Sequence, residues 1–265
     1  MKLFDSHCHI DDKAYNQDRK DVIDNAINAG VQGMMIVGIT EKSAHKAVEI
    51  ANDYPQCFAS VGIHPHDAKT CSESVLNSLV ELSNHPKVKA WGETGLDFNR
   101  MYSPQSIQEK WFIRQLEISE KNNLPVIFHE RDSKGRLLEI LRSYDPNERK
   151  GVIHCFSGIK KELRGYLDLN YDIGITGILT HLKRGEYLRS LIDYIPIERV
   201  VIETDAPYLT PSPERNHTRR NEPAFVRTTF IKLCDIREED PELLSSLLWD
   251  NTCRLYEING LDINQ

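Results

Sequence analysis

The sequence predicts an α/β fold, a (β/α)8 TIM barrel formed as a single domain over residues 1–265. Eight short apolar runs alternate with longer amphipathic segments, and this alternation implies parallel strands joined by right-handed helical crossovers. A chain of 265 residues also has the length that such barrels commonly use. The competing arrangement, an open doubly wound sheet, usually carries a Gly-rich phosphate loop after its first strand, where this chain has His-Cys-His. We therefore expect the barrel.

The expected strands and helices follow one another along the chain. The strands are expected at residues 2–10, 33–39, 57–65, 88–97, 125–131, 151–158, 171–179 and 198–208. The helices are expected at residues 16–29, 41–53, 72–84, 105–123, 133–144, 160–169 and 184–194, with two more in 223–258 that break near Pro241. The stretch 207–223 contains too many prolines and polar residues for a helix, so we expect one long functional loop there.

Composition narrows the class of protein. Hydrophobic residues make up 40% and charged residues 28% of the chain, as in ordinary globular proteins. No apolar run approaches the roughly 20 residues of a membrane span, and the segment MKLFDSHCHI lacks the apolar stretch of a signal peptide, so we expect a cytoplasmic protein that contacts no membrane. The six cysteines form no C-x-x-C pair and are expected to be reduced thiols. The formal charge of −7 argues against broad, non-specific adhesion to nucleic acid.

The first strand carries the motif Asp5-x-His7-x-His9. Because alternate residues of a strand point to the same face, these three side chains are expected to point into the barrel, with Phe4 and Cys8 on the opposite face against the helices. Two imidazoles two positions apart near a strand end can bind one metal ion, and Asp5 could orient one of them. The alternative is a pair of surface histidines on an edge strand. The apolar strand and the added aspartate favour the metal site.

Four further candidates stand at the ends of later strands. They are Glu93 in AWGE, His129 in VIFHER, His154 after Gly-Val-Ile, and Asp205 after Val-Val-Ile-Glu-Thr. The carboxyl ends of parallel strands are where barrel enzymes hold their active sites. Each residue alone could be a satisfied structural polar group, but chance hardly explains why all of them fall at the same end of the barrel.

Divalent cations would offset the mutual repulsion of such a cluster. Carboxylates and imidazoles together suit Zn²⁺, Mn²⁺ or Fe²⁺, and they accommodate Mg²⁺ when waters complete the coordination shell. We therefore expect two divalent metal ions, which could activate a water and stabilise the leaving oxygen of a hydrolysed ester.

His64 and Arg131 are candidate substrate-binding residues. His64, in the segment GIHPHD, ends the third strand and could hydrogen-bond a substrate phosphate; alternatively, it and His66 cap the turn around Pro65. Arg131 could hold a phosphate through two parallel hydrogen bonds, or it could pair with a carboxylate such as Glu93.

The loop after the eighth strand and nearby tyrosines provide further candidates. Arg220, with Arg219 and Asn221 beside it, is placed for contacts with a phosphate backbone. A solvated loop charge is the default interpretation and is favoured for Arg219. Tyr102 and Tyr208, near strand ends, could stack on a nucleobase.

Several segments, taken together and in order, resemble the TatD family of metal-dependent deoxyribonucleases. They are LFDSHCHID, VGIHPHD, GETGLDFNR, PVIFHER, HCFSG, IGITG, IETDAPYL and RRNEPAF. The match runs from the first strand to the start of the helix after the long loop, and as a set these motifs are highly specific.

This resemblance implies a barrel, a divalent-metal site and 3′–5′ exonuclease activity on single-stranded DNA or RNA. The implied first metal site is His7, His9 and Asp205, the second is His129 and His154, and Glu93 bridges the two. Glu93 and Asp205 would be the catalytic residues, and Asp205 would help to deprotonate the attacking water. Some family members lack the first-strand histidine pair, which this chain retains, so two complete metal sites are expected.

Two other functions remain open. A metal-dependent amidase or ester hydrolase, such as a D-aminoacyl-tRNA deacylase, would share the His-x-His motif. Many barrel amidohydrolases, however, have a carboxylated lysine at the end of the fourth strand, where this chain has Glu93. A non-catalytic barrel that binds nucleic acid or a protein would have little need for so many ionisable groups in one cavity. We expect a monomer without an obligatory protein partner.

Overall fold

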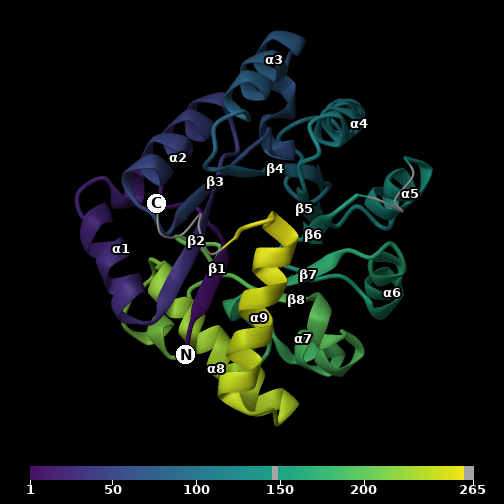
Figure 1. Cartoon of the computed structure of the whole chain (residues 1–265). Coiled ribbons are helices and arrows are strands. Elements are labelled where there is room, and N and C mark those ends of the chain that lie inside the picture. The colour runs from purple at the N-terminus through teal and green to yellow at the C-terminus, as the bar shows by residue number, and fades with distance from the viewer. Residues whose placement is uncertain (145–148, 260–265) are drawn as a thin grey trace.

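The computed structural model describes residues 1–144 and 149–259, and it contains a parallel sheet of eight strands curled into a barrel with helices around it (Figure 1). The strands are β1 Leu3–Cys8, β2 Val31–Val37, β3 Cys57–Val61, β4 Val88–Asp97, β5 Val126–Arg131, β6 Gly151–Ile153, β7 Asp172–Ile175 and β8 Val200–Ile202. They are ordered in the sheet as in the sequence. A parallel bridge between Cys8 and Ala206 joins the end of β1 to the segment after β8. The predicted (β/α)8 barrel is confirmed.

The helices lie close to their predicted positions. They are α1 Arg19–Asn28, α2 Glu41–Asp53, α3 Glu73–Leu82, α4 Gln105–Lys121, α5 Arg136–Ser143, α6 Lys160–Asp168, α7 Glu186–Leu191, α8 Val226–Arg237 and α9 Pro241–Tyr256. Short 3-10 helices lie in the connections: η1 Lys13–Tyr15, η2 Pro65–Thr70, η3 Gly177–Thr180, η4 Ile192–Tyr194, η5 Ile197–Arg199, η6 Glu214–Asn216 and η7 Pro223–Phe225.

Local sequence explains where individual helices start. The α2 helix begins after Thr40, whose hydroxyl accepts a hydrogen bond from the Ser43 N–H while the Ser43 hydroxyl accepts one from the Thr40 N–H. The α5 helix begins three residues later than predicted because Gly135, with φ of 86°, turns the chain just before it.

The last strands are shorter than predicted, and this shortening places the polar residues on loops. The strand predicted at 198–208 ends at Ile202, and Asp205 then adopts a left-handed φ of 57°. The strand predicted at 151–158 ends at Ile153, and Cys155 has φ of 48°. His154 and Asp205 therefore lie just beyond the sheet, where the backbone can redirect their side chains.

Two hydrophobic layers hold the barrel together. The outer layer packs between strands and helices, whereas the inner layer fills the barrel with residues such as Phe4, Phe58 and Val201. The α9 helix crosses the barrel in Figure 1 and covers the amino-terminal ends of the strands. The Phe4 ring lies 6.0 Å from Phe58 and 5.6 Å from Trp249 of α9, measured between ring centroids. The barrel is thus closed at this end and presents its polar residues at the other.

The predicted alternation of β1 is wrong for Phe4 and Asp5. Phe4 belongs to the inner layer rather than to the helix-facing one. Asp5 pairs with Met34 and Cys8 with Ile36, so three steps along β1 match two along β2. This bulge puts Asp5 and Cys8 on the outward side while His7 turns inward, because an extra residue reverses the alternation.

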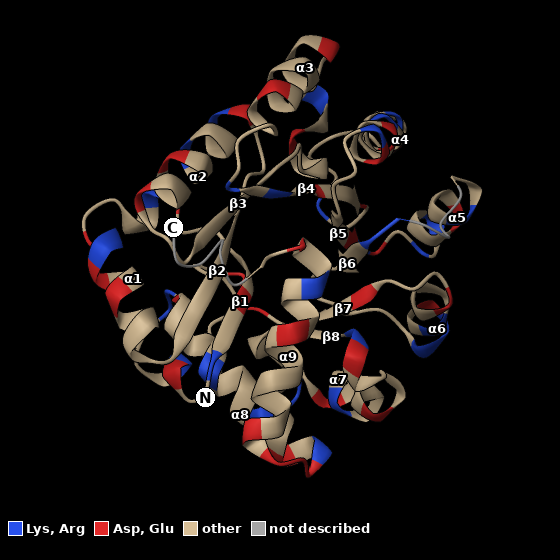
Figure 2. Ribbon diagram, in the orientation of Figure 1, with Lys and Arg blue, Asp and Glu red and all other residues tan. Residues whose placement is uncertain are grey.

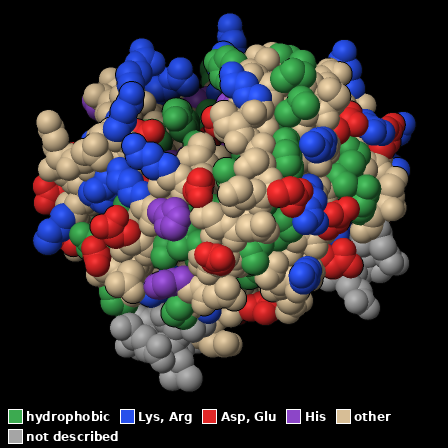
Figure 3. Space-filling model, turned by 90° about the horizontal axis from the view of Figure 1, so that it is seen from above, with side chains coloured by type: hydrophobic (Ala, Val, Ile, Leu, Met, Phe, Trp, Pro, Cys, Tyr) green, Lys and Arg blue, Asp and Glu red, His purple; other side chains and the backbone are tan. Residues whose placement is uncertain are grey.

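The surface carries charges of both signs. Lys and Arg are interspersed with Asp and Glu along the helices (Figure 2), although Lys and Arg side chains gather at the upper left of Figure 3. Among the residues described, no helix combines the length and apolar character needed to cross a membrane. All six cysteines are free thiols.

We predict that Phe4→Ala lowers the free energy of unfolding by about 3–5 kcal/mol, because it leaves a cavity against Phe58 and Trp249. Urea denaturation followed by tryptophan fluorescence measures this decrease. Leu182→Ala, at a side chain that is 83% exposed, is the control and should stay within about 0.5 kcal/mol of the parent. Equal stability of the two variants would contradict the packing of Phe4 inside the barrel.

Candidate metal centre

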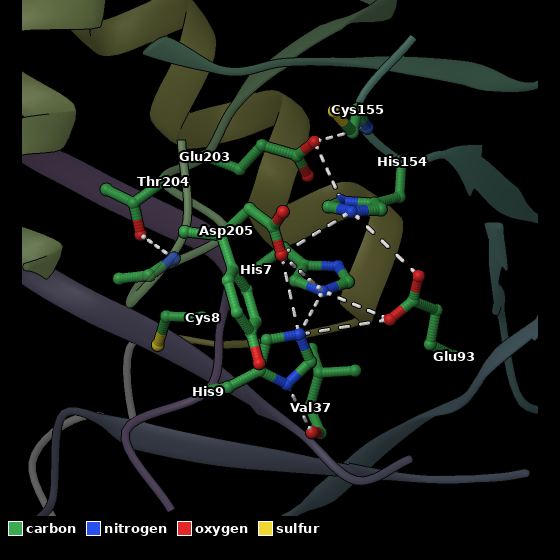
Figure 4. A network of polar contacts seen from close by, with 12 residues as sticks. His7, Cys8, His9, Val37, Glu93, His154, Cys155, Glu203, Thr204 and Asp205 are labelled. Carbon is green, nitrogen blue, oxygen red and sulfur yellow. Dashed lines mark hydrogen bonds and ion pairs between the residues drawn. The ribbon is translucent and has the colours of Figure 1, made fainter. Parts of the chain in front are cut away.

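The six side chains predicted as metal ligands meet at the carboxyl end of the barrel, and Figure 4 shows five of them. They are His7, His9, Glu93, His129, His154 and Asp205. The His7 Nε2 lies 3.5 Å from Glu93 Oε2 and 3.8 Å from Asp205 Oδ1. The His154 Nε2 lies 3.8 Å from Asp205 Oδ1 and 3.9 Å from Glu93 Oε1. Glu93 reaches the other side of the group as well, since its Oε1 is 2.6 Å from His129 Nδ1.

The spacing of these atoms fits bound cations. Two ligands that each lie about 2.1 Å from one tetrahedral ion are about 3.4 Å apart. The His7 and His9 Nε2 atoms are 3.2 Å apart, and the His9 Nε2 is 3.5 Å from Asp205 Oδ1. In addition, His7, His9 and Glu93 offer three ligand atoms within 4.8 Å of one another, as do His7, His154 and Asp205. The donor set is therefore arranged for divalent metal.

Three of the histidines have a second partner that fixes their orientation. The His9 Nδ1 lies 3.0 Å from the carbonyl oxygen of Val37, so its Nε2 faces the cluster. The His154 Nδ1 pairs with Glu203 Oε1 at 2.9 Å. Such a partner sets which ring nitrogen carries the proton and which is free to bind metal.

Asp97 is the corresponding partner of His129. This fully buried carboxylate accepts hydrogen bonds from the backbone N–H groups of Asn99 and Arg100 at 3.0 and 2.7 Å. Its Oδ2 lies 3.3 Å from His129 Nε2 and 2.6 Å from His66 Nε2. No sequence pattern indicates this role, because Asp97 resembles any acidic residue at a strand end.

His64 faces the cluster as a hydrogen-bond donor. Its Nδ1 accepts the backbone N–H of His66 at 3.0 Å, so the predicted cap of the turn is present. Burial lowers the pKa of His64 to about 4, and the neutral ring must then carry its proton on Nε2. That Nε2 lies 3.5 Å from Glu93 Oε1. Although His64, His66 and His129 lie close enough to hold an ion, this tautomer leaves His64 without a free lone pair for one.

The two carboxylates of the cluster stay ionised. Burial alone would raise the pKa of Glu93, but the imidazoles of His64 and His129 hold it well below its ordinary value. Burial likewise opposes ionisation of Asp205, and the hydrogen bond from His9 outweighs it and lowers the pKa.

The imidazoles divide into two kinds. Burial alone would lower the pKa of His9, but the hydrogen bond to Asp205 raises it to about 9. His129 behaves similarly: burial is outweighed by hydrogen bonds to Asp97 and Glu93, and its pKa rises to about 9. By contrast, burial and the neighbouring His154 lower the pKa of His7. Without metal, protons on His9 and His129 therefore offset part of the negative charge of Glu93, Asp205 and Asp97.

The predicted substrate-binding arginines occupy different environments. Arg131 ends β5 and is partly exposed, and within residues 1–144 and 149–259 its side chain makes no hydrogen bond or ion pair, including the alternative pair with Glu93. Arg220 instead lies 2.7 Å from Asp18 Oδ2 and 2.9 Å from Glu222 Oε1. It ties the long loop to the β1–α1 connection, and its contact with substrate stays a prediction.

Asn221 and Asp5 have structural roles that sequence reasoning missed. Asn221 is fully buried, so the expected contact with substrate phosphate is wrong for it. Its Nδ2 donates to the carbonyl oxygens of Thr204 and Tyr208 at 2.9 and 2.6 Å, on either side of Asp205. Asp5 accepts from the Thr204 N–H at 2.8 Å and its hydroxyl at 2.6 Å, and therefore fastens the same segment from β1.

Comparison with known proteins identifies the family. Residues 4–257 match the model of the family described as TatD related DNase. The chain belongs to this family. It is 36% identical over 261 residues to the 3'-5' ssDNA/RNA exonuclease TatD of Salmonella typhimurium, covering 97% of this chain and 99% of that one. The resemblance seen in the sequence segments is confirmed, and this TatD-family chain is a metal-dependent hydrolase.

Solved structures of TatD-family proteins have the same fold as this chain. A TatD homologue from Escherichia coli K12 superimposes with a TM-score of 0.90 at 27% identity, covering 97% of this chain and 98% of that one. A TatD-family hydrolase from Entamoeba histolytica gives a TM-score of 0.87 at 26% identity, with the same coverage of 97% and 98%.

We predict that Glu203→Gln weakens divalent-metal binding by about 10–100-fold, because His154 loses the carboxylate that orients it. Isothermal titration with Mn²⁺ measures the affinity. Glu198→Gln, an exposed residue of η5, is the control and should bind Mn²⁺ like the parent. Unchanged affinity in Glu203→Gln would contradict the orienting role.

We also predict that metal binding releases protons at neutral pH. Metal binds neutral imidazole, whereas His9 and His129 stay protonated below their pKa of about 9 in the metal-free protein. Affinity for Mn²⁺ should thus increase as pH rises towards that value. Titrations at pH 7 in buffers of different ionisation enthalpy count the protons, and a count of zero would contradict protonation of these two imidazoles.

Proposed function

We propose that this TatD-family chain is a divalent-metal-dependent phosphodiesterase that works as a 3′–5′ exonuclease on single-stranded DNA or RNA. The observation that carries the proposal is the arrangement of four imidazoles and two carboxylates in one largely buried cluster. Full-length similarity to proteins named 3'-5' ssDNA/RNA exonuclease TatD supports the choice of substrate.

The proposal assigns two divalent ions, Mg²⁺, Mn²⁺ or Zn²⁺, to this cluster. His7, His9 and Asp205 would hold one ion, His129 and His154 the other, and Glu93 would contact both. Bound ions of this kind lower the pKa of water and neutralise charge on phosphoryl oxygens. Because one chain supplies every ligand, a monomer is sufficient.

The carboxylates complete the proposed chemistry. The Asp205 side chain is 16% exposed, whereas that of Glu93 is 4% exposed, so Asp205 is the more accessible of the two to a water entering from the opening. Its lowered pKa keeps it ionised, and Asp205 can take the proton of the attacking water at Oδ1 or Oδ2. Glu93, held between imidazoles on both sides, keeps the two halves of the site in fixed relation.

The substrate phosphate would be held by residues at the rim. The His64 Nε2–H points at the cluster and can donate to a non-bridging phosphoryl oxygen as negative charge develops there. Arg131 is proposed as a second phosphate contact, because its guanidinium has no partner elsewhere in the described chain. Arg220 is proposed as a contact farther along the strand, made from its place between Asp18 and Glu222.

We predict that Glu93→Gln abolishes degradation of 5′-labelled single-stranded DNA, with a decrease of at least about 1000-fold in kcat, because it removes charge from both halves of the cluster. Removal of divalent ions by EDTA should abolish activity in the parent, and Mn²⁺ or Mg²⁺ should restore it. Glu49→Gln, at an exposed position of α2, is the matched control and should retain full activity.

Charged tRNA and labelled DNA distinguish the competing functions. Metal-dependent release of the aminoacyl group without degradation of the DNA would favour an ester hydrolase instead. Binding of either substrate without any metal-dependent turnover would favour a non-catalytic barrel.

A further inference from the structure

A cavity of about 610 Å³ lies beside the metal centre, between the start of α5 and the start of α6. Its wall includes Glu130, which follows His129 in β5, and Ser157, which lies on the β6–α6 connection shortly after His154. The cavity is therefore at the same end of the barrel as the cluster but outside it. Its volume is in the range of sites that bind small molecules or parts of larger ones.

The carboxylates that line this cavity are all engaged within the chain. Each accepts a hydrogen bond: Glu130 from the Ser133 N–H at 3.0 Å, Asp132 from Asn99 Nδ2 at 2.6 Å, Glu139 from Arg136 Nη1 at 3.1 Å, and Glu162 from the Ile159 N–H at 2.9 Å. These partners hold the four carboxylates in place, and Arg136 also compensates the charge of Glu139.

The cations that line it are not engaged. Lys134, Arg142 and Lys161 have no ion pair, hydrogen bond or aromatic partner among residues 1–144 and 149–259. Lys160, next to Lys161 in sequence, shows the contrast, because its Nζ lies 3.2 Å from the centre of the Tyr194 ring. The cavity thus offers three free positive charges against carboxylates that are already hydrogen-bonded.

Other features of the wall suit a nucleotide chain. The α5 and α6 helices both begin at the cavity. The Glu162 carboxylate already accepts the Ile159 N–H at the start of α6, whereas Gly135 before α5 provides no side-chain cap, so the positive end of the α5 dipole favours an anion there. Ile159, which is 54% exposed, and Leu138 supply apolar surface on which a sugar or base can rest.

We propose that this cavity binds the phosphodiester backbone of the substrate strand on the 5′ side of the scissile bond, with Lys134, Arg142 and Lys161 as phosphate contacts. The proposal rests on the exonuclease function: removal of a 3′ nucleotide requires the remaining strand to leave the metal centre in its 5′ direction. The ends of β5 and β6 provide such an exit, because His129 and His154 lie there in the cluster while neighbouring residues of the same segments line the cavity. Contacts with phosphates would hold the strand without selecting its sequence.

The test compares substrates with and without phosphates beyond the scissile bond. Thymidylyl-thymidine has only the scissile phosphate, whereas a long oligothymidylate has many more. In the double variant Lys134→Glu/Lys161→Glu, KM for the oligomer should rise at least about 10-fold, while kcat/KM for the dinucleotide stays unchanged. The control is Lys42→Glu, because Lys42 is an exposed second residue of α2 just as Lys161 is of α6.

Salt dependence gives a second readout. The slope of log affinity against log salt is measured by fluorescence anisotropy with a labelled oligothymidylate, using Glu93→Gln protein to prevent cleavage. Its magnitude should fall by about 0.7 for each phosphate that the protein no longer neutralises. Addition of the two lysine substitutions to this protein should therefore flatten the slope, and addition of Lys42→Glu should not.

The outcomes separate the two proposals. Equal KM and equal salt slope in the lysine variant and the parent, or equally weakened binding in Lys42→Glu, would overturn the cavity assignment and leave the exonuclease function intact. If the parent hydrolyses neither substrate, the exonuclease proposal fails, and an unchanged anisotropy slope in the lysine variant would then overturn the cavity assignment as well.

Discussion

Glu93 and Asp205 carry negative charge inside a barrel where little water can solvate them. The imidazoles around them are arranged so that positive charge can compensate these two carboxylates. Protons on His9 and His129 provide compensation in the metal-free chain, and divalent ions would replace them. The rings of His7 and His154 stack at 3.5 Å between centroids, and the Nε2 atom of each lies within 4 Å of both Glu93 and Asp205. Burial of these carboxylates costs free energy unless a positive charge, such as a bound cation, compensates them.

The backbone departs from regular geometry where these side chains must converge. A bulge in β1 turns His7 inward, and β6 and β8 end early so that His154 and Asp205 leave the sheet. Asp205 holds a left-handed φ of 57°, a conformation that costs energy in a non-glycine residue. Buried polar groups stabilise it, because Asn221 bonds to the carbonyl oxygens on both sides of that residue. The irregular backbone segments therefore lie next to the clustered side chains, and buried side chains such as Asn221 stabilise them.

Much of this arrangement could be predicted from the sequence, for physical reasons that also define the limit. Strand alternation and the rule that active sites occupy strand ends identified the six clustered residues, including His154 and Asp205. The same alternation misplaced Phe4 and Asp5, because a bulge leaves no mark in a pattern of period two. The burial of Asn221 could not be predicted from the sequence, because it depends on how the long loop after β8 packs. The pairing of Asp97 with His129 depends on the register of neighbouring strands.

Anomalous diffraction from crystals soaked in Mn²⁺ tests most directly whether these side chains form a metal centre. We expect anomalous density within coordination distance of Glu93, flanked on one side by His7 and His9 and on the other by His129. Crystals saturated with Mn²⁺ that show no anomalous density among these side chains would contradict the metal centre.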